Sequence, residues 1–193
     1  MYRRMMTGTI LATLAMAGLS GCMPKMTMEE MAQMRPERPV ELDKLNAWVG
    51  TWKASGTVKM MGIDEEITLS GTSQNAWGVD RWCLLEHGEY EMGAMGKMNG
   101  LGVWTWDTKA KRFRSNWFDS MGGTGSGTAK YDEMTRTWTM NMRGKGPGGA
   151  TRGKGYVRFV DDDTMEWAWQ EWPAWDLLGL FKFMDMKATS TRQ

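Results

Sequence analysis

Apolar and polar side chains alternate along most of the chain after Gly50. The clearest run places Trp52, Ala54, Val58 and Met60 on one face and polar residues on the other. A period of two residues is typical of a half-buried β-strand. The same pattern predicts ten strands, over residues 52–60, 65–76, 82–92, 99–106, 112–119, 124–131, 136–143, 153–160, 164–172 and 181–191.

The segments between these strands are short and rich in Gly, Asp, Asn and Lys. None is long enough for a crossover helix, so consecutive strands are expected to pair antiparallel. Ten short strands in a flat sheet would leave exposed edges, and closure into a barrel removes them. We therefore predict an all-β, antiparallel up-and-down barrel of about ten strands. The same alternation also permits a two-sheet sandwich.

A weak internal repeat supports the hairpins. Trp106-Asp107, Tyr131-Asp132 and Val160-Asp161 each precede turn residues and then an aromatic residue. An Asp in this place accepts hydrogen bonds from backbone N–H groups of its own turn. We favour this structural role over the alternative that the three carboxylates are catalytic.

The segment before the first strand is divided into a tether and a short helix. Leu42, Leu45 and Trp48 recur at helical spacing, which predicts a short N-terminal helix over residues 41–49. Residues 22–40 are polar and contain three prolines, so they are predicted to form a tether. The folded domain is expected to cover residues 41–193.

The N-terminus has the features of an export signal. Arg3 and Arg4 precede an apolar run over residues 9–19 that is too short to span a bilayer, so residues 1–21 are predicted to be a signal peptide. The run ends in Leu19-Ser20-Gly21-Cys22, which resembles the bacterial lipobox. The resemblance implies lipid attachment at Cys22 and an outer-membrane lipoprotein that faces the periplasm. An ordinary secretory peptide is the alternative.

Gly50-Thr51-Trp52 resembles the Gly-x-Trp signature of lipocalin-like (calycin) barrels. In that family a basic residue of a late strand packs over the tryptophan and closes the barrel, which implies this role for Arg192. The segment 117–120, the Gly-rich residues after it, Tyr131-Asp132 and Thr191-Arg192 are also similar to a family of uncharacterised bacterial calycin-like domains. That resemblance implies a barrel and a ligand cavity but no activity, so Gly50, Trp52 and Arg192 are structural candidates.

Composition excludes several classes of function. The chain has 24 basic and 23 acidic side chains, without the basic excess that nucleic-acid binding requires. Cys83 is the only cysteine besides Cys22, so no disulfide is expected if Cys22 carries lipid. His87 is the single histidine, which excludes multi-histidine metal sites; we expect a surface residue rather than a haem ligand, and we expect no cofactor.

Tryptophans supply most of the candidate ligand pocket. Trp104 with Trp106, and Trp167 with Trp169, share one face of their strands. The full set of pocket candidates is Trp104, Trp106, Trp117, Trp138, Trp167, Trp169, Arg114 and Arg158. An inward arginine would pair with a ligand carboxylate, and the favoured alternative for most of the arginines is a solvated position on the outer face. The alternation does not tell which face points inward, so a filled barrel remains an alternative.

Methionine chemistry offers a further alternative. Met92, Met95 and Met98 follow a spacing that suits Cu(I), since soft thioethers are ligands of that ion. Between the last two strands, residues 172–178 are too apolar for a routine turn and predict a lid, a lipid-facing or partner-facing patch, or a loop folded over the core. The sequence thus favours a non-catalytic, membrane-anchored barrel that binds a small apolar or amphipathic ligand. The alternatives are a filled barrel that serves as an interaction module, and a Cu(I)-binding protein.

Overall fold

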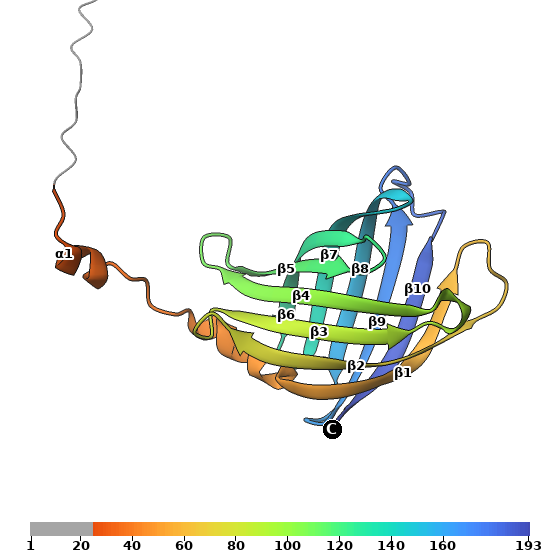
Figure 1. The fold of residues 1–193 in the computed structure, drawn as a ribbon, viewed down its shortest axis with the longest axis horizontal. Helices are drawn as coiled ribbons and strands as arrows, with labels where there is room; N and C mark the ends of the chain where they lie inside the picture. The colour runs from red at the N-terminus through yellow and green to blue at the C-terminus, as the bar shows by residue number, and fades with distance from the viewer. Residues whose placement is uncertain (1–24) are drawn as a thin grey trace, which may run out of the picture. The chain divides into compact units, whose positions relative to one another are not determined.

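The computed structural model describes residues 25–193 (Figure 1). The predicted signal peptide and Cys22 therefore lie outside the described residues. The chain divides into two compact units after Glu37, and each is described by itself. In the described part, no helix has the length and apolar character needed to span a membrane.

The first unit contains one short helix, α1 (Met28–Gln33), within the segment predicted to be a tether. Thr27 begins it with a capping box, because its side chain accepts from the backbone N–H of Glu30 while the Glu30 carboxylate accepts from the backbone N–H of Thr27. The helix ends before Pro36. The prolines of this segment therefore prevent a long helix but permit this short one.

The second unit is a closed barrel of ten antiparallel strands. Each strand pairs with the next along the chain, and β1 pairs with β10 to close the ring (Figure 1). This confirms the all-β barrel and excludes the sandwich. The strands are β1 (Gly50–Met60), β2 (Ile67–Gly78), β3 (Cys83–Glu91), β4 (Lys97–Asp107), β5 (Arg112–Asp119), β6 (Thr124–Asp132), β7 (Thr137–Gly146), β8 (Gly149–Phe159), β9 (Thr164–Pro173) and β10 (Met184–Arg192).

The three repeated aspartates cap hairpin turns. Asp107 accepts from the backbone N–H of Ala110 at 2.8 Å, and Asp132 accepts from that of Thr135 at 3.0 Å. Asp161 accepts from the backbone N–H two residues later at 2.9 Å. These hydrogen bonds favour the ionised carboxylate, so they hold the pKa values of Asp107 and Asp132 below their usual range. The three aspartates therefore have the turn-capping role that the sequence repeat predicts.

A 3₁₀ helix, η1 (Val40–Trp48), closes one end of the barrel. Its buried side chains Leu42, Leu45 and Trp48 pack into a cluster that we name the closed-end core. The members of this core are Leu42, Leu45, Trp48, Trp52, Leu84, Trp104, Phe113, Ala129, Trp138, Met140, Val157, Phe159 and Met165. A smaller cluster of Val58, Leu69, Met92 and Ala188 lies toward the other end, which we name the mouth. Both cores lie within residues 38–193, so this part of the chain is expected to fold independently.

Gly50, Trp52 and Arg192 meet at the closed end. The Arg192 guanidinium lies 4.3 Å from the centre of the Trp52 ring and donates to the backbone oxygens of Val49 and Ala47. The Trp52 indole donates to the backbone oxygen of Trp48, 2.8 Å away. Gly50 has a φ of +130°, and a Cβ at this position would lie 2.6 Å from Arg192 Nη1. Glycine is therefore required by both conformation and space.

Candidate functional site

The barrel encloses a cavity of about 460 Å³ between the closed-end core and the mouth. This volume lies within the range of small-molecule pockets, roughly 300–1,000 Å³. The aromatic residues of its wall are Trp48, Tyr90, Trp104, Trp117, Tyr156, Trp167, Trp169 and Phe183. Ten methionines also line it, namely Met60, Met92, Met95, Met98, Met121, Met140, Met142, Met165, Met184 and Met186. The interior of the barrel is therefore not filled by side chains.

Glycines at inward positions explain why the interior is hollow. A Cβ at Gly100 would lie 2.2 Å from the Trp117 ring, so this indole lies flat against the neighbouring strand. The Trp169 ring covers two glycines in the same way, since Cβ atoms at Gly153 and Gly155 would lie 2.0 and 2.5 Å from it. Packing large rings over strand glycines is a known way to support such glycines. The rings therefore form the wall and leave the centre of the barrel open.

Polar side chains fix the orientation of the wall indoles. Each of four lining tryptophans donates its Nε1–H to an acceptor on the same wall: Trp104 to Glu86 at 3.1 Å, Trp117 to Asp119 at 3.1 Å, Trp167 to Ser190 at 3.0 Å and Trp169 to Glu171 at 3.4 Å. A buried indole N–H needs such a partner. The bonds therefore hold each ring in one position against its strand.

Glu86 is a polar group in the middle of this wall. It lies on β3 between the inward residues Leu84 and Gly88, and it faces Gly102 of β4 across the strand pair. Burial raises the pKa of its carboxyl, because the charged form is disfavoured in apolar surroundings, and the indole hydrogen bond from Trp104 offsets part of this. The Glu86 carboxyl is therefore a hydrogen-bonding group in a largely apolar wall.

Tyr90 is the next inward polar residue of β3 on the way to the mouth. Burial raises the pKa of its phenol well above the usual range, and the nearby Glu86 carboxyl raises it further. The ring covers Gly88, where a Cβ would lie 2.4 Å away. The cavity thus combines a broad apolar surface with two hydrogen-bonding groups.

The structure brings four of the six candidate pocket tryptophans together. Trp104, Trp117, Trp167 and Trp169 line the cavity. The other two need correction. Trp138 is fully buried within the closed-end core, and Trp106, near the end of β4, packs against that core. Both lie on the inward face of the barrel, but on the closed-end side of the cavity.

The two candidate arginines also need correction. Arg114 alternates with the inward Phe113 on β5, so it points outward and pairs with Asp107 at 2.8 Å. Arg158 likewise lies on the outer face of β8 and pairs with Glu166 at 2.6 Å. The period of two that buries their neighbours excludes both from the cavity.

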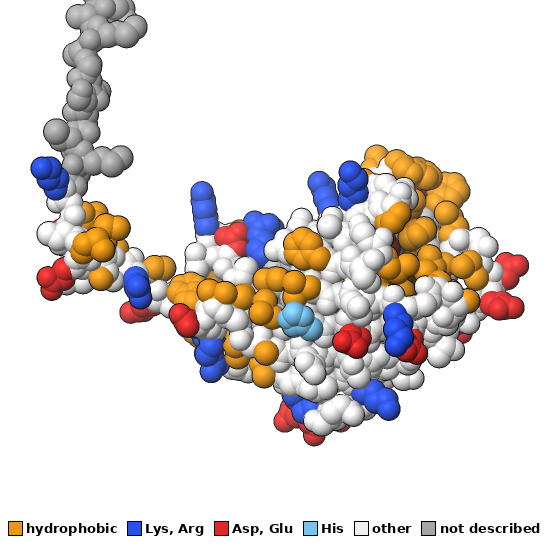
Figure 2. Space-filling view, in the orientation of Figure 1, with side chains coloured by type: hydrophobic (Ala, Val, Ile, Leu, Met, Phe, Trp, Pro, Cys, Tyr) orange, Lys and Arg blue, Asp and Glu red, His pale blue; other side chains and the backbone are white. Residues whose placement is uncertain are grey.

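The remaining candidates divide between the inner and outer faces. Met92, Met95 and Met98 all line the cavity near the β3–β4 connection. His87 is exposed on the outer face of β3 (Figure 2), which keeps its imidazole away from the cavity. Cys83 is a free, partly buried thiol on the same outer face. Within residues 25–193, no group of three or more His, Cys, Asp or Glu side chains is arranged to hold a metal ion.

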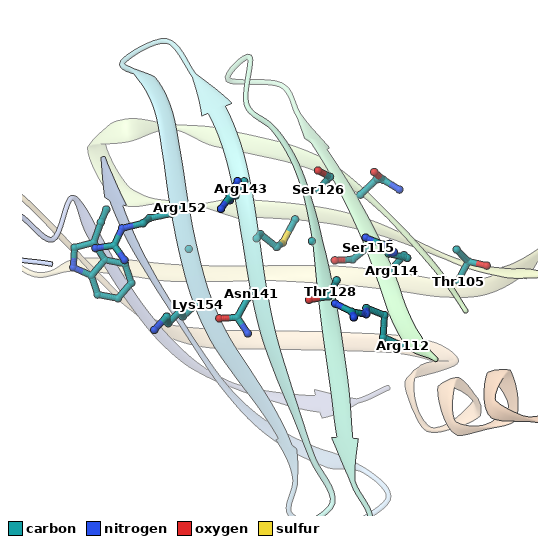
Figure 3. A pocket seen from close by; sticks show the side chains of 15 residues that line it. Thr105, Arg112, Arg114, Ser115, Ser126, Thr128, Asn141, Arg143, Arg152 and Lys154 are labelled. Atoms are coloured by element: carbon teal, nitrogen blue, oxygen red, sulfur yellow. The ribbon is translucent and has the colours of Figure 1, made fainter. Parts of the chain in front are cut away.

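A second hollow of about 820 Å³ lies on the outer face of β5–β8, and we name it the outer groove (Figure 3). Short polar residues such as Ser126, Thr128 and Asn141 form its floor. Its basic residues are Arg112, Arg114, Arg143, Arg152 and Lys154. Sequence reasoning missed this groove, although short outward residues flanked by arginines on consecutive strands are a signal for it.

Comparisons with known proteins agree with the fold. The crystal structure of Rv2717c from M. tuberculosis has a TM-score of 0.61 and 15% identity, and the match covers 81% of this chain and 99% of that chain. A protein of unknown function from the DUF3598 family of Nostoc punctiforme has 5% identity, with coverage of 82% and 100%, but its TM-score of 0.24 carries no structural argument. No curated protein matches the chain.

Similarity at 15% identity to a solved structure shows a common fold and nothing about activity. The family comparison rests on the sequence itself. The pattern of DUF1579, described as a protein of unknown function, matches residues 40–186, which span η1 and nearly the whole barrel. The chain therefore belongs to the DUF1579 family.

Proposed function

We propose that this protein is a non-catalytic barrel that binds a small apolar or amphipathic ligand in its central cavity. The observation that carries the proposal is the hollow interior, which the wall rings maintain by lying flat over inward glycines. An enclosed, mostly apolar pocket with a few polar groups is the usual form of a small-molecule site.

The chemistry of the wall supports a ligand with an apolar body and one hydrogen-bonding group. Thioether side chains are flexible and polarisable, so a methionine-rich wall adapts to ligands of different shape. Glu86 and Tyr90 offer hydrogen-bonding partners for a hydroxyl, amide or carboxyl group.

The proposed cellular setting follows from the N-terminal sequence. Lipid on Cys22 would hold the protein at the periplasmic face of the outer membrane, with residues 22–40 as a tether. In that position the barrel would sequester its ligand or pass it along the cell envelope. The proposal of lipid attachment is tested by the mass of the protein isolated from its own membrane.

Native mass spectrometry of the full chain extracted from its own envelope tests the ligand proposal. The expected result is a co-purifying small molecule. Met186→Trp adds an indole on the cavity wall, and Lys187→Trp adds the same group on the exposed outer face of β10 as the matched control. The ligand mass is expected to persist in the Lys187→Trp protein and to disappear in the Met186→Trp protein.

Circular dichroism shows whether both variants keep the β-sheet signal, so loss of ligand is distinguished from loss of fold. Protein without any bound mass in the wild type would contradict the proposal. Retention of the ligand by a folded Met186→Trp protein would place it outside the cavity and would also contradict the proposal.

The ten lining methionines favour Cu(I) binding as a second candidate function. Titration of residues 38–193 with Cu(I) under reducing conditions tests it. Replacement of Met92, Met95 and Met98 by leucine keeps the apolar wall but removes three sulfur atoms. Saturable binding that weakens in this variant supports the candidate, and absence of saturable binding in the wild type excludes it.

A further inference from the structure

The connection between β9 and β10 exposes a cluster of large apolar side chains. Trp175, Leu177, Leu178 and Leu180 are between 70 and 83% exposed. We name residues 174–183 the apolar loop. Figure 2 shows hydrophobic side chains gathered at the upper right of the molecule, where Figure 1 draws this connection. A contiguous exposed apolar patch on a protein surface marks a binding site.

Asp176 fixes the backbone of the apolar loop. Its carboxylate is buried and accepts from the backbone N–H groups of Gly179 at 2.9 Å, Leu180 at 3.1 Å and Phe181 at 2.7 Å. These bonds lower the pKa of Asp176 against the opposing effect of desolvation, so the carboxylate stays ionised. The loop is therefore ordered in a form that presents its apolar side chains outward, and it does not fold back over the core.

Cationic and N–H groups lie directly beneath this loop. The Arg152 guanidinium lies 5.5 Å from the centre of the Trp172 ring and donates to the backbone oxygen of Asp176. Arg152 Nε and Trp172 Nε1 are buried and have no hydrogen-bond acceptor among the described residues. A Cβ at Gly179 would lie 3.6 Å from both Arg152 Nη2 and Trp172 Nε1. Buried donors without an acceptor are uncommon in folded proteins, and here the Arg152 cation lies directly under the apolar loop.

The apolar loop continues into the basic end of the outer groove. Arg143, Arg152 and Lys154 line this end (Figure 3), and neither Arg143 nor Lys154 has an ion-pair partner among the described residues. Exposed apolar residues beside basic residues are the combination that binds the interface of an anionic bilayer, where rings and leucines enter the acyl boundary and cations meet phosphates. The charge of this surface complements that of anionic lipids.

We propose that the apolar loop and the basic end of the outer groove bind the surface of an anionic phospholipid bilayer. Trp175, Leu177 and Leu178 insert below the head groups, while Arg143 and Lys154 contact lipid phosphates. Phe183, at the end of the loop, also lines the cavity. The docked orientation thus sets the barrel mouth against the bilayer, so an apolar ligand passes between lipid and cavity with little exposure to water. This last step rests on the proposed function, whereas the bilayer contact does not.

Co-sedimentation of residues 38–193 with vesicles tests the bilayer contact, because this part of the chain lacks Cys22. Binding is expected to vesicles that contain phosphatidylglycerol, to weaken as salt rises, and to be much weaker with phosphatidylcholine alone. Leu177→Ser with Leu178→Ser is expected to weaken binding at least about tenfold, since two leucines no longer enter the bilayer. Arg143→Ala with Lys154→Ala is expected to reduce the preference for anionic lipid and its salt dependence.

Matched controls use equally exposed residues away from this surface. Val79→Ser removes an apolar side chain that is 75% exposed in the β2–β3 turn, and Lys53→Ala removes an outward charge on β1. Both controls are expected to bind vesicles as the wild type does. Wild-type protein that binds neither kind of vesicle would overturn the proposal, as would leucine variants that bind unchanged. A dimer in sedimentation velocity that the leucine variant abolishes, without vesicle binding, would show that a second copy covers the loop instead.

Discussion

Arg192→Ala removes the side chain that seals the closed end of the barrel. In the wild type its guanidinium covers Trp52 and donates to the backbone oxygens of Val49 and Ala47. It also reaches the exposed Asp163 carboxylate at 3.1 Å. The side chain is therefore the common partner of β1, the end of η1 and the β8–β9 turn.

The expected loss of stability follows from these contacts. Hydrogen bonds from a charged group contribute roughly 1.5–3 kcal/mol each when partly buried. A cation over an indole contributes about 1 kcal/mol, and the exposed ion pair contributes at most about 1 kcal/mol. Water that enters the vacated space satisfies part of the two carbonyls, so we expect Arg192→Ala to lower the free energy of unfolding by about 3–4 kcal/mol.

Urea unfolding of residues 38–193, followed by circular dichroism, measures this loss. Arg158→Ala is the matched control, because its ion pair with Glu166 lies on the surface and its removal is expected to lower the free energy by less than about 1 kcal/mol. Arg192→Lys keeps the charge but not the planar fork, so we expect an intermediate loss. An Arg192→Ala protein no less stable than the Arg158→Ala protein would refute the reasoning about the seal.

Two further predictions concern the cavity wall. Because burial raises the pKa of Glu86, its contribution to stability is fully present below its unfolded pKa of about 4.3 and is lost as pH rises through the folded value. Urea unfolding at several pH values should therefore show the wild type losing stability relative to Glu86→Gln toward neutral pH. A difference in the free energy of unfolding that stays constant with pH would contradict this. Gly153→Ala places a methyl group where the Trp169 ring lies and should lower the free energy of unfolding by about 1–3 kcal/mol. A double-mutant cycle with Trp169→Ala should recover part of that loss, and strict additivity would show that the two residues do not interact.

The number of strands and their closure are predictable because they depend on local properties. Period-two alternation locates each strand, and short turns with aspartate caps force antiparallel neighbours. Only the strand ends differ noticeably: β8 begins at Gly149 instead of 153, and β10 begins at Met184 instead of 181. The first difference arises because glycines extend the β7–β8 hairpin, and the second because the apolar loop occupies residues 174–183.

The inner surface was harder to predict because alternation defines two faces without naming the inner one. Arg114 and Arg158 are candidates for the cavity in the sequence, although each directly follows a buried residue, Phe113 or Val157. Because neighbouring side chains on a strand point to opposite faces, this position already predicts that both arginines lie on the outer face. Glu86 was missed for the opposite reason, since it begins a charged stretch that suggests a surface.

The hollow interior depends on side-chain torsions that periodicity does not encode. Trp117 and Trp169 would fill the barrel if their rings pointed to its centre, and they line it because the facing positions are Gly100, Gly153 and Gly155. The signal available in the sequence was therefore the row of inward glycines on neighbouring strands, not the tryptophans themselves. The apolar loop was recognised from composition, but its outward orientation depends on the backbone contacts of Asp176.

Methyl NMR of residues 38–193 with labelled methionines tests most directly whether the barrel interior binds an apolar ligand. Met60, Met98 and Met186 line the cavity, whereas Met134 is 96% exposed in the β6–β7 turn and serves as an internal control. On titration with 1-decanol, a neutral amphipath, the account predicts saturable shifts of the three cavity methyl groups and a constant Met134 signal. Cavity methyl groups that do not respond, or that respond no more than Met134, would contradict it.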